Sequence, residues 1–335
     1  MSREIKQKMG SSQQILKKMT IKDKVYSEFK ITSPIILELI KTKAFQRLKG
    51  ISQFGVPNKY YHLDGYSRYE HSIGVYILLN RLGASEEEQV AGLLHDISHM
   101  AFSHLVDWVI GDSSKEDYQD KRHLSVLQEK EIAQILSKYG YSSENIADYH
   151  RFGLLEQDAS DLCADRIDYA FRESATEIAE QCLPDLKVFN GKIVFSLEES
   201  ALLFAENFLN RQIQHWAGYE AITRYVLLAD LLKKTIQDKV INLEDFLVTD
   251  DFVINKVIKA NKKEYLKVLN LLENKNLNFL ARSNVSTKKK FRYVDPKILI
   301  NGKLERLSVL SKEFSKKLEK ARRSNDKGTY SGIFT

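Results

Sequence analysis

Apolar residues recur every three or four positions along most of the chain, the period of an amphipathic α-helix. Ser33 before Pro34 predicts one helix start, and Ser85 with Glu88 three residues later predicts another through a capping box. The pattern predicts helices over residues 34–53, 67–82, 124–139 and 155–174, one opening at Ser85, and a long helical stretch over 196–236. We therefore expect a mainly α protein.

The pattern changes after about residue 240. Upstream of that point, Asn190-Gly191 between two short apolar runs predicts a small hairpin. Beyond it, Asn261 with Glu264 predicts a helix start. Short apolar runs and the Asn301-Gly302 turn predict strands over 291–294 and 298–300, followed by a lysine-rich helix over 311–323. We predict a helical body over 1–240 and a small mixed α/β lobe over 241–335.

Composition supports a folded helical protein. The 335 residues include only 15 Gly and 4 Pro, with 43% hydrophobic and 29% charged residues, which excludes a disordered or turn-rich chain. The two cysteines, Cys163 and Cys182, exclude a disulfide scaffold and a thiolate zinc cluster. Apolar runs are far shorter than the roughly 20 residues that a bilayer requires, and the first residues do not match a signal peptide. We expect a cytoplasmic protein without membrane association.

Charge is unevenly distributed behind the net value of +6. Residues 251–335 hold 21 Lys or Arg against 8 Asp or Glu, whereas residues 1–250 hold 30 against 37. An acidic body with a basic end indicates a cation site in the first part and an anionic partner, such as nucleic acid, for the second. A solvated basic surface is the alternative explanation.

Four of the eight histidines fall between residues 71 and 104. His95 and Asp96 are adjacent where an apolar helical run ends. Neighbouring residues cannot share a helix face, but at a helix end they can chelate one ion through a nitrogen and an oxygen. His99 follows one turn later on the side of His95.

Carboxylates recur at helical spacing further along the chain. Asp161, Asp165 and Asp168 would share one stripe of the helix predicted over 155–174. Stacked like charges cost stability unless a cation or an arginine offsets them. With the histidines, this stripe predicts a mixed shell for Mn, Mg, Fe, Ni or Zn.

Several segments together are similar to one enzyme family. YEH (His71), the HD pair His95-Asp96 and ADRIDY (Asp165) resemble the HD-domain metal-dependent phosphohydrolases. More narrowly, FQRLKGISQFG, SRYEHSIGV, LLHDISHMAFSH and DRIDYAFRE resemble their deoxynucleotide triphosphohydrolase branch, over about residues 22–275. The resemblance implies an HD-domain helical bundle with one divalent metal.

The resemblance also implies roles for matching residues. The metal ligands would be His71, His95, Asp96 and Asp165. His99 and His123 would lie over the phosphates, and His104, held by Asp107, would be the general acid for the leaving 5′ oxygen. Arg68 and Arg166 would contact phosphate oxygens, and Gln53 and Tyr169 would touch the deoxyribose. His215 is expected to be structural.

The implied reaction is hydrolysis of a deoxynucleoside triphosphate to deoxynucleoside and triphosphate. The family further implies a homo-oligomer. Gln46, Arg47 and Lys49 are retained from the family's effector-binding segment, so binding of an anionic nucleotide effector is also implied. Three alternatives stay open: a phosphodiesterase or nucleotidase, a nuclease that uses the basic lobe, and a nucleotide-sensing module without turnover.

The sequence departs from the family pattern at several positions. Ser98, Met100 and Ala101 replace Gly, Gly and Pro in the loop after the HD pair, which makes that loop bulkier. Glu173 stands where relatives have Asp, and Ile213 replaces a tyrosine that packs on sugar or base. Lys41 replaces an effector-reading acid, so guanine selection is not implied.

Overall fold

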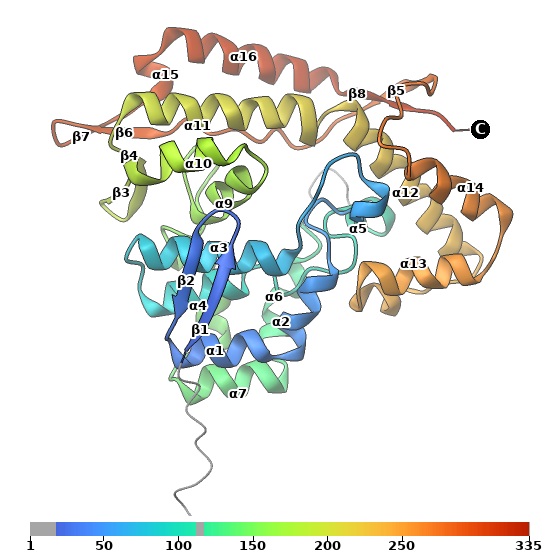
Figure 1. Cartoon of the computed structure of the whole chain (residues 1–335), viewed down its shortest axis with the longest axis horizontal. Coiled ribbons are helices and arrows are strands. Elements are labelled where there is room, and N and C mark those ends of the chain that lie inside the picture. The colour runs from blue at the N-terminus through green and yellow to red at the C-terminus, as the bar shows by residue number, and fades with distance from the viewer. Residues whose placement is uncertain (1–17, 112–116, 335) are drawn as a thin grey trace, which may run out of the picture.

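A computed structural model describes residues 18–111 and 117–334; the N-terminal residues predicted not to be a signal peptide lie largely outside this range. The mainly α prediction is confirmed (Figure 1). The first helices are α1 (Pro34–Lys41), α2 (Lys43–Arg47), α3 (Arg68–Arg81), α4 (Glu86–Leu94), α5 (Leu105–Val109), α6 (Asp120–Leu127), α7 (Lys130–Lys138) and α8 (Ser143–Ala147). The later ones are α9 (Ala164–Arg172), α10 (Thr176–Cys182), α11 (Glu198–Arg211), α12 (Tyr219–Gln237), α13 (Asp250–Lys259), α14 (Lys263–Leu272), α15 (Leu307–Leu310) and α16 (Lys312–Lys327). Short 3-10 turns are η1 (Leu48–Gly50), η2 (Asn58–Tyr60), η3 (Tyr149–Arg151), η4 (Leu183–Asp185) and η6 (Leu243–Leu247), and η5 (Gln212–Trp216) is π-helical.

Small sheets connect distant parts of the chain. The strands are β1 (Met19–Asp23), β2 (Ser27–Ile31), β3 (Leu186–Phe189), β4 (Lys192–Phe195), β5 (Arg282–Thr287), β6 (Lys297–Ile300), β7 (Lys303–Arg306) and β8 (Thr329–Gly332). The hairpin predicted at Asn190-Gly191 is confirmed as β3–β4, and both turn residues have positive φ. The sheet order β3-β4-β6-β7 joins this hairpin to the C-terminal hairpin. The parallel pairing of β4 with β6 crosses the boundary predicted at residue 240. The division into two domains there stays a prediction.

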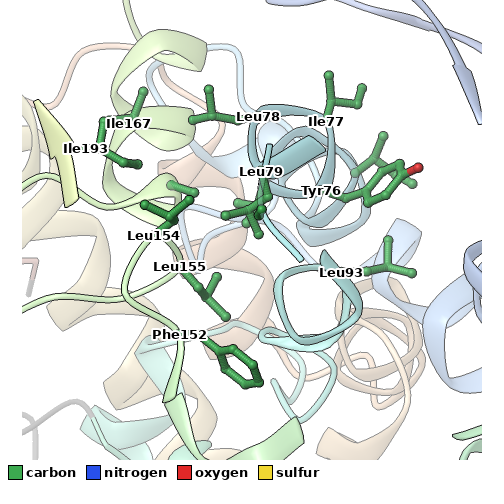
Figure 2. Packing of buried hydrophobic residues seen from close by; sticks show 14 of the residues in the cluster. Tyr76, Ile77, Leu78, Leu79, Leu93, Phe152, Leu154, Leu155, Ile167 and Ile193 are labelled. Atoms are coloured by element: carbon green, nitrogen blue, oxygen red, sulfur yellow. The ribbon is translucent and has the colours of Figure 1, made fainter. Parts of the chain in front are cut away.

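Helix α3 forms the centre of the larger core. Residues Ile73 to Leu79 are buried almost all round the helix, as expected for a helix enclosed by others. Helices α4 and α9 pack against it. Figure 2 shows Leu154 and Leu155, from the segment before α9, beside Leu79 of α3, with Phe152 further away beyond Leu155. The core therefore holds α3, α4 and α9 in fixed relation, and the residues predicted to bind metal lie on these helices or directly after α4.

Three predicted helices have different bounds. The helix over 34–53 breaks at Thr42, whose extended backbone ends α1 and whose hydroxyl accepts from the Phe45 amide to start α2. The helix over 124–139 starts earlier and breaks at Glu129, which is also extended, into α6 and α7. The helix over 155–174 begins only at Ala164. Carbonyls of the preceding loop accept bonds from the Arg166 guanidinium, which stabilises the irregular backbone.

Smaller predictions were also wrong. Residues 291–294 form no strand; only Val294 makes a single bridge, to Ser160. Asn261 does not cap α14, because its positive φ follows the end of α13 and Lys262 takes the cap position. Ser85 does cap α4, but the Glu88 carboxylate binds the amides of Leu154 and Leu155 instead of completing a capping box. The Glu88 carboxylate thus satisfies groups that are distant in sequence, which the local pattern does not encode.

Among the described residues, none of the helices combines the length and apolarity needed to span a bilayer.

Candidate active site and metal centre

The four residues predicted to bind metal converge from three helices. His71 lies in the first turns of α3, His95 and Asp96 follow the last residue of α4, and Asp165 lies in the first turn of α9. His71 is fully buried, whereas His95 and Asp165 are partly accessible from a cavity. The spacing in the sequence thus becomes one cluster because α3, α4 and α9 pack together.

Donor atoms in this cluster face one another. Nε2 of His71 lies 2.8 Å from Oδ1 of Asp165 and 3.2 Å from Nε2 of His95. Nε2 of His95 lies 3.5 Å from Oδ1 of Asp96 and 3.6 Å from Oδ1 of Asp165. Ligands of an ion with bonds of about 2.1 Å lie roughly 3 Å apart, so these separations suit a shared ion.

The far side of each imidazole is fixed. Nδ1 of His71 lies 2.7 Å from Oδ2 of Asp168, and Nδ1 of His95 lies 2.7 Å from the carbonyl oxygen of Gly92. With these acceptors, each Nδ1 keeps its proton, so each Nε2 can present a lone pair to a bound cation once that cation displaces the proton on Nε2. Two lone pairs and two carboxylates then converge, and only a proton or a cation can satisfy them. The donor set therefore fits a divalent metal.

Electrostatics of the cluster favour positive charge. Burial acts to lower the pKa of His71, but hydrogen bonds to Asp165 and Asp168 outweigh it and raise that pKa to about 9. Burial would raise the pKa of Asp165, yet the hydrogen bond with His71 and the nearby imidazole of His95 hold it well below its usual value. The carboxylates therefore remain ionised and attract a cation at neutral pH.

A buried ion-pair network supports His71. Nε of Arg172 donates to Oδ2 of Asp168 at 2.7 Å, and Nη2 donates to Oδ2 of Asp23 at 2.7 Å. Gly74 on α3 permits this approach, because a Cβ there would lie 2.0 Å from both Arg172 Nη2 and Asp168 Oδ1. The stripe prediction was half wrong, since Asp161 precedes α9 and binds Lys192, Lys297 and Arg306 instead.

A cavity of about 600 Å³ opens beside the cluster. Among its lining residues are the site candidates Gln53, Arg68, His95, Asp96, His99, His104, Asp165, Arg166 and Tyr169. A set that we call the aromatic group, Phe54, Tyr61, His215, Trp216 and Tyr225, lines it as well. Tyr169 connects the two parts: its ring centroid lies 6.4 Å from that of His71 and 5.4 Å from that of Trp216. The volume suits a small-molecule ligand.

The predicted phosphate-facing histidines differ in position. His99 lines the cavity, and its Nε2 lies 3.2 Å from Oδ1 of Asp96. Burial and the charge of Arg68 lower the pKa of His99 to about 4, so it is neutral and donates to Asp96. His123 lies behind Tyr149, whose hydroxyl is 2.8 Å from Nε2 of His123, and is not among the described residues that line the cavity.

His104 lines the cavity, with its ring centroid 5.0 Å from that of His99. Asp107 is buried one turn later on α5, and its Oδ1 accepts from the amide of Tyr118 at 3.1 Å. The predicted His104–Asp107 pairing stays a prediction.

The two predicted phosphate-binding arginines hold protein groups. Arg68 donates from Nη1 to Oδ2 of Asp96 at 2.7 Å and from Nε to Oγ of Ser103 at 3.0 Å. Arg166 donates to Oε1 of Glu156 at 2.8 Å and to carbonyls of the loop before α9. Arg68 thereby orients one metal-ligand candidate, and Arg166 shapes the cavity wall.

The residues predicted for the sugar both line the cavity. Oε1 of Gln53 is buried and has no hydrogen-bond partner among the described residues, which leaves an acceptor for a ligand hydroxyl. Tyr169, on α9, packs edge to face against the ring of Trp216.

Of the residues predicted for an effector, two are engaged within the protein. Arg47 donates to the carbonyls of Ile97 and His99, and Gln46 donates to the carbonyl of Ile40. Lys49 lies over the ring of Tyr69, with Nζ 4.7 Å from the centroid. An effector site on these residues stays a prediction.

Sequence reasoning missed a polar contact within the aromatic group. Oε2 of Glu173 lies 2.9 Å from Nδ1 of His215 and 2.7 Å from Nε1 of Trp216, and Nε2 of His215 lies 2.8 Å from the Tyr61 hydroxyl. The π-helical turn η5 carries both His215 and Trp216. Such turns are rare and often found at functional sites, but α-helical periodicity cannot reveal them.

Asp250, from the part of the chain after residue 240, braces the loop that follows the HD pair. Its Oδ1 accepts from the Phe102 amide at 2.7 Å and its Oδ2 from the Ser52 amide at 2.8 Å. Phe102 and Ser103 have positive φ, a costly conformation for these residues. Ser103 in turn contacts Arg68, so Asp250 supports the orientation of Arg68 beside Asp96.

We expect Asp250 to make stability pH-dependent. Burial raises its pKa to about 7, although the two amide donors oppose that rise. An unfolded Asp has a pKa of about 4, so between these values the folded state binds more protons, and stability falls as pH rises. Relative to Asp250→Asn, which cannot titrate, the wild type should lose up to about 4 kcal/mol between pH 4 and 7. Urea denaturation of both proteins at pH 5 and pH 8 measures this change. If the free energies of unfolding of the two proteins differ by the same amount at both pH values, the prediction is contradicted.

Comparison with known proteins agrees with this geometry. The HD domain family matches residues 68–172, a range that includes all four metal-ligand candidates. The Bacillus subtilis protein YdhJ is 37% identical over 93% of this chain and 98% of its own length. The metal-dependent phosphohydrolase cns2 of Cordyceps militaris is 31% identical, over 66% of this chain and 69% of its own.

A more distant relative is named for one specific reaction. The Dictyostelium discoideum homolog of the deoxynucleoside triphosphate triphosphohydrolase SAMHD1 is 26% identical, over 76% of this chain and 58% of its own length.

Proposed function

The chain belongs to the HD-domain metal-dependent phosphohydrolases, and on that premise we propose that it hydrolyses deoxynucleoside triphosphates to deoxynucleoside and triphosphate. One observation carries the proposal: a single cavity joins the metal-ligand cluster, through Tyr169, to the aromatic group. A triphosphate placed at the cluster would leave its nucleoside among aromatic rings, which stack on bases and sugars. The distant relative named for this reaction supports the same substrate class.

The proposed chemistry begins at the cluster. His71, His95, Asp96 and Asp165 would hold a divalent cation, which when bound supplies charge to polarise a phosphoryl oxygen and acidify water. Arg68 fixes Asp96, and neutral His99 donates to the same carboxylate, so both hold that ligand in one orientation. Water adds to the α-phosphorus, the bond from phosphorus to O5′ breaks, and O5′ requires a proton.

His104 is the proposed proton donor to O5′. It lines the cavity beside His99 and is more accessible than His99 or His123. An imidazole can carry that proton near neutral pH and recover it from solvent. The unpartnered Oε1 of Gln53 would accept from a sugar hydroxyl, and the Tyr169 ring would pack against the sugar.

Product analysis tests the proposal. Purified protein is incubated with Mn²⁺ or Mg²⁺ and with each dNTP and NTP, alone and mixed, and products are separated by ion-pair chromatography. We expect deoxynucleoside and triphosphate in equal amounts, and neither from a His95→Ala/Asp96→Ala variant. Release of monophosphate and pyrophosphate, or turnover of cyclic nucleotides or single-stranded nucleic acid only, would replace the proposal with a phosphodiesterase or nuclease. Tight binding without products would indicate a sensing module.

A further inference from the structure

The basic C-terminal region contributes one wall of the active-site cavity. Lys289, Lys290, Phe291, Arg292 and Tyr293, which we call the basic wall, line the cavity together with the metal-ligand candidates. The HD domain match ends at residue 172, more than one hundred residues earlier in the chain. Part of the positive charge noted in the sequence therefore faces the reaction site.

Hydrogen bonds fix the backbone of the basic wall. The carbonyl of Lys289 accepts from Nδ2 of Asn325 at 3.1 Å, and the amide of Arg292 donates to Oε1 of Gln212 at 3.3 Å. The amide of Asp295 donates to the carbonyl of Ser160 at 2.9 Å. The wall is thus attached to α16, to η5 and to the loop before α9.

Ring stacking holds the same segment. The rings of Phe291 and Tyr293 stack with centroids 5.3 Å apart, and the guanidinium carbon of Arg322 lies 4.7 Å from the Tyr293 centroid. Such attachment positions side chains before a ligand arrives, which lowers the entropy lost on binding.

The three cations of the wall are distributed along the cavity. Nζ of Lys289 lies 3.8 Å from the ring centroid of Tyr225, in the aromatic group. Lys290 is exposed at the cavity surface. Burial raises the pKa of the Asp120 carboxyl, and the nearby charge of Lys290 opposes that rise. Burial raises the pKa of the Tyr169 hydroxyl, and the nearby charge of Arg292 opposes that rise. Positive charge thus borders the path from the aromatic group to the cluster.

Two further arginines of the cavity bind protein groups. Arg68 is paired with Asp96, and Arg166 with Glu156 and loop carbonyls. A triphosphate carries several negative charges, and the cluster neutralises only those near the reacting phosphorus. The remaining phosphates need further cations, and the basic wall supplies them in the same cavity.

We propose that the basic wall binds the polyphosphate of the substrate, with Lys290 and Arg292 as the contacting residues. This inference rests on the proposed function for its substrate, a nucleoside triphosphate. It also gives the basic C-terminal region an anionic partner within the active site.

The test measures binding of inorganic tripolyphosphate by calorimetry, with intact protein and without turnover. We expect Lys290→Ala and Arg292→Gln each to weaken binding about 3- to 10-fold, and added salt to reduce the difference. Lys320→Ala is the matched control, because Lys320 is exposed on α16 and outside the cavity lining, and it should leave the affinity unchanged. Binding of an uncharged deoxynucleoside should not change in any of the three variants.

The outcomes separate this inference from the proposed function. Wild-type affinity for tripolyphosphate in both wall variants would overturn the inference, even if the protein hydrolyses dNTPs. Weaker binding in both variants would support it, even if no dNTP is hydrolysed. No binding by the wild type, or a single-stranded oligonucleotide that binds far more tightly than tripolyphosphate and responds to the same variants, would also overturn it.

Discussion

Asp165→Asn is expected to reduce metal-dependent hydrolysis by more than about 10³-fold. The carboxylate faces Nε2 of both His71 and His95, and its pKa is held low, so it contributes a full negative charge to the cluster. Asparagine keeps the shape but removes that charge and one anionic ligand. Steady-state kinetics with the best substrate, and metal content by plasma spectrometry, measure the loss.

Asp230→Asn is the matched control for this substitution. Asp230 is exposed on α12 and pairs only across one helical turn with Lys233, so the same chemical change there should leave hydrolysis at the wild-type rate. Full activity and metal content in Asp165→Asn would show that the cluster is not the metal site.

Arg172→Met should destabilise the protein by about 3–5 kcal/mol. The substitution leaves the buried carboxylates of Asp168 and Asp23 without their shared cation, while keeping a side chain of similar length. Asp168 also orients His71, so metal affinity should fall by about 10- to 100-fold in the protein that remains folded. Urea denaturation and metal titration measure the two effects separately.

Arg323→Met provides the comparison. Arg323 is mostly exposed on α16 and pairs with Glu319 one turn away, a contact that contributes little in water. A change below about 0.5 kcal/mol is expected there. Equal small changes in both variants would contradict a structural role for the Arg172 network.

The sequence was most informative where function depends on residues close in the chain. The apolar run before His95 predicted that the HD pair lies at a helix end, and the structure ends α4 at Leu94. The helix predicted over 67–82 is confirmed as α3, which carries His71; in the structure Ser67 caps its start with a complete capping box, and Gly83, with positive φ, follows its end. These signals act within one or two helical turns, and tertiary packing left them intact.

Sequence reasoning failed where a side chain satisfies a distant group. The helix over 155–174 was predicted to begin too early, because the guanidinium of Arg166 holds an irregular loop there; the phosphate contact predicted for Arg166 stays a prediction. A glycine inside a helical pattern, such as Gly74, can indicate that other groups approach the backbone closely. At Gly74 the groups are the paired side chains of Asp168 and Arg172, which leave no space for a Cβ. The basic wall lay in a region predicted as a separate lobe, and only the three-dimensional packing brings it to the cavity.

Hydrolysis in ¹⁸O-labelled water tests the central claim most directly. The account predicts that water adds to the α-phosphorus, so each triphosphate released from a dNTP should carry one solvent oxygen and the deoxynucleoside none. Mass spectrometry of both products, with the His95→Ala/Asp96→Ala variant as control, gives the answer. Label in the deoxynucleoside, cleavage elsewhere in the polyphosphate chain, or equal turnover in the variant would contradict the account.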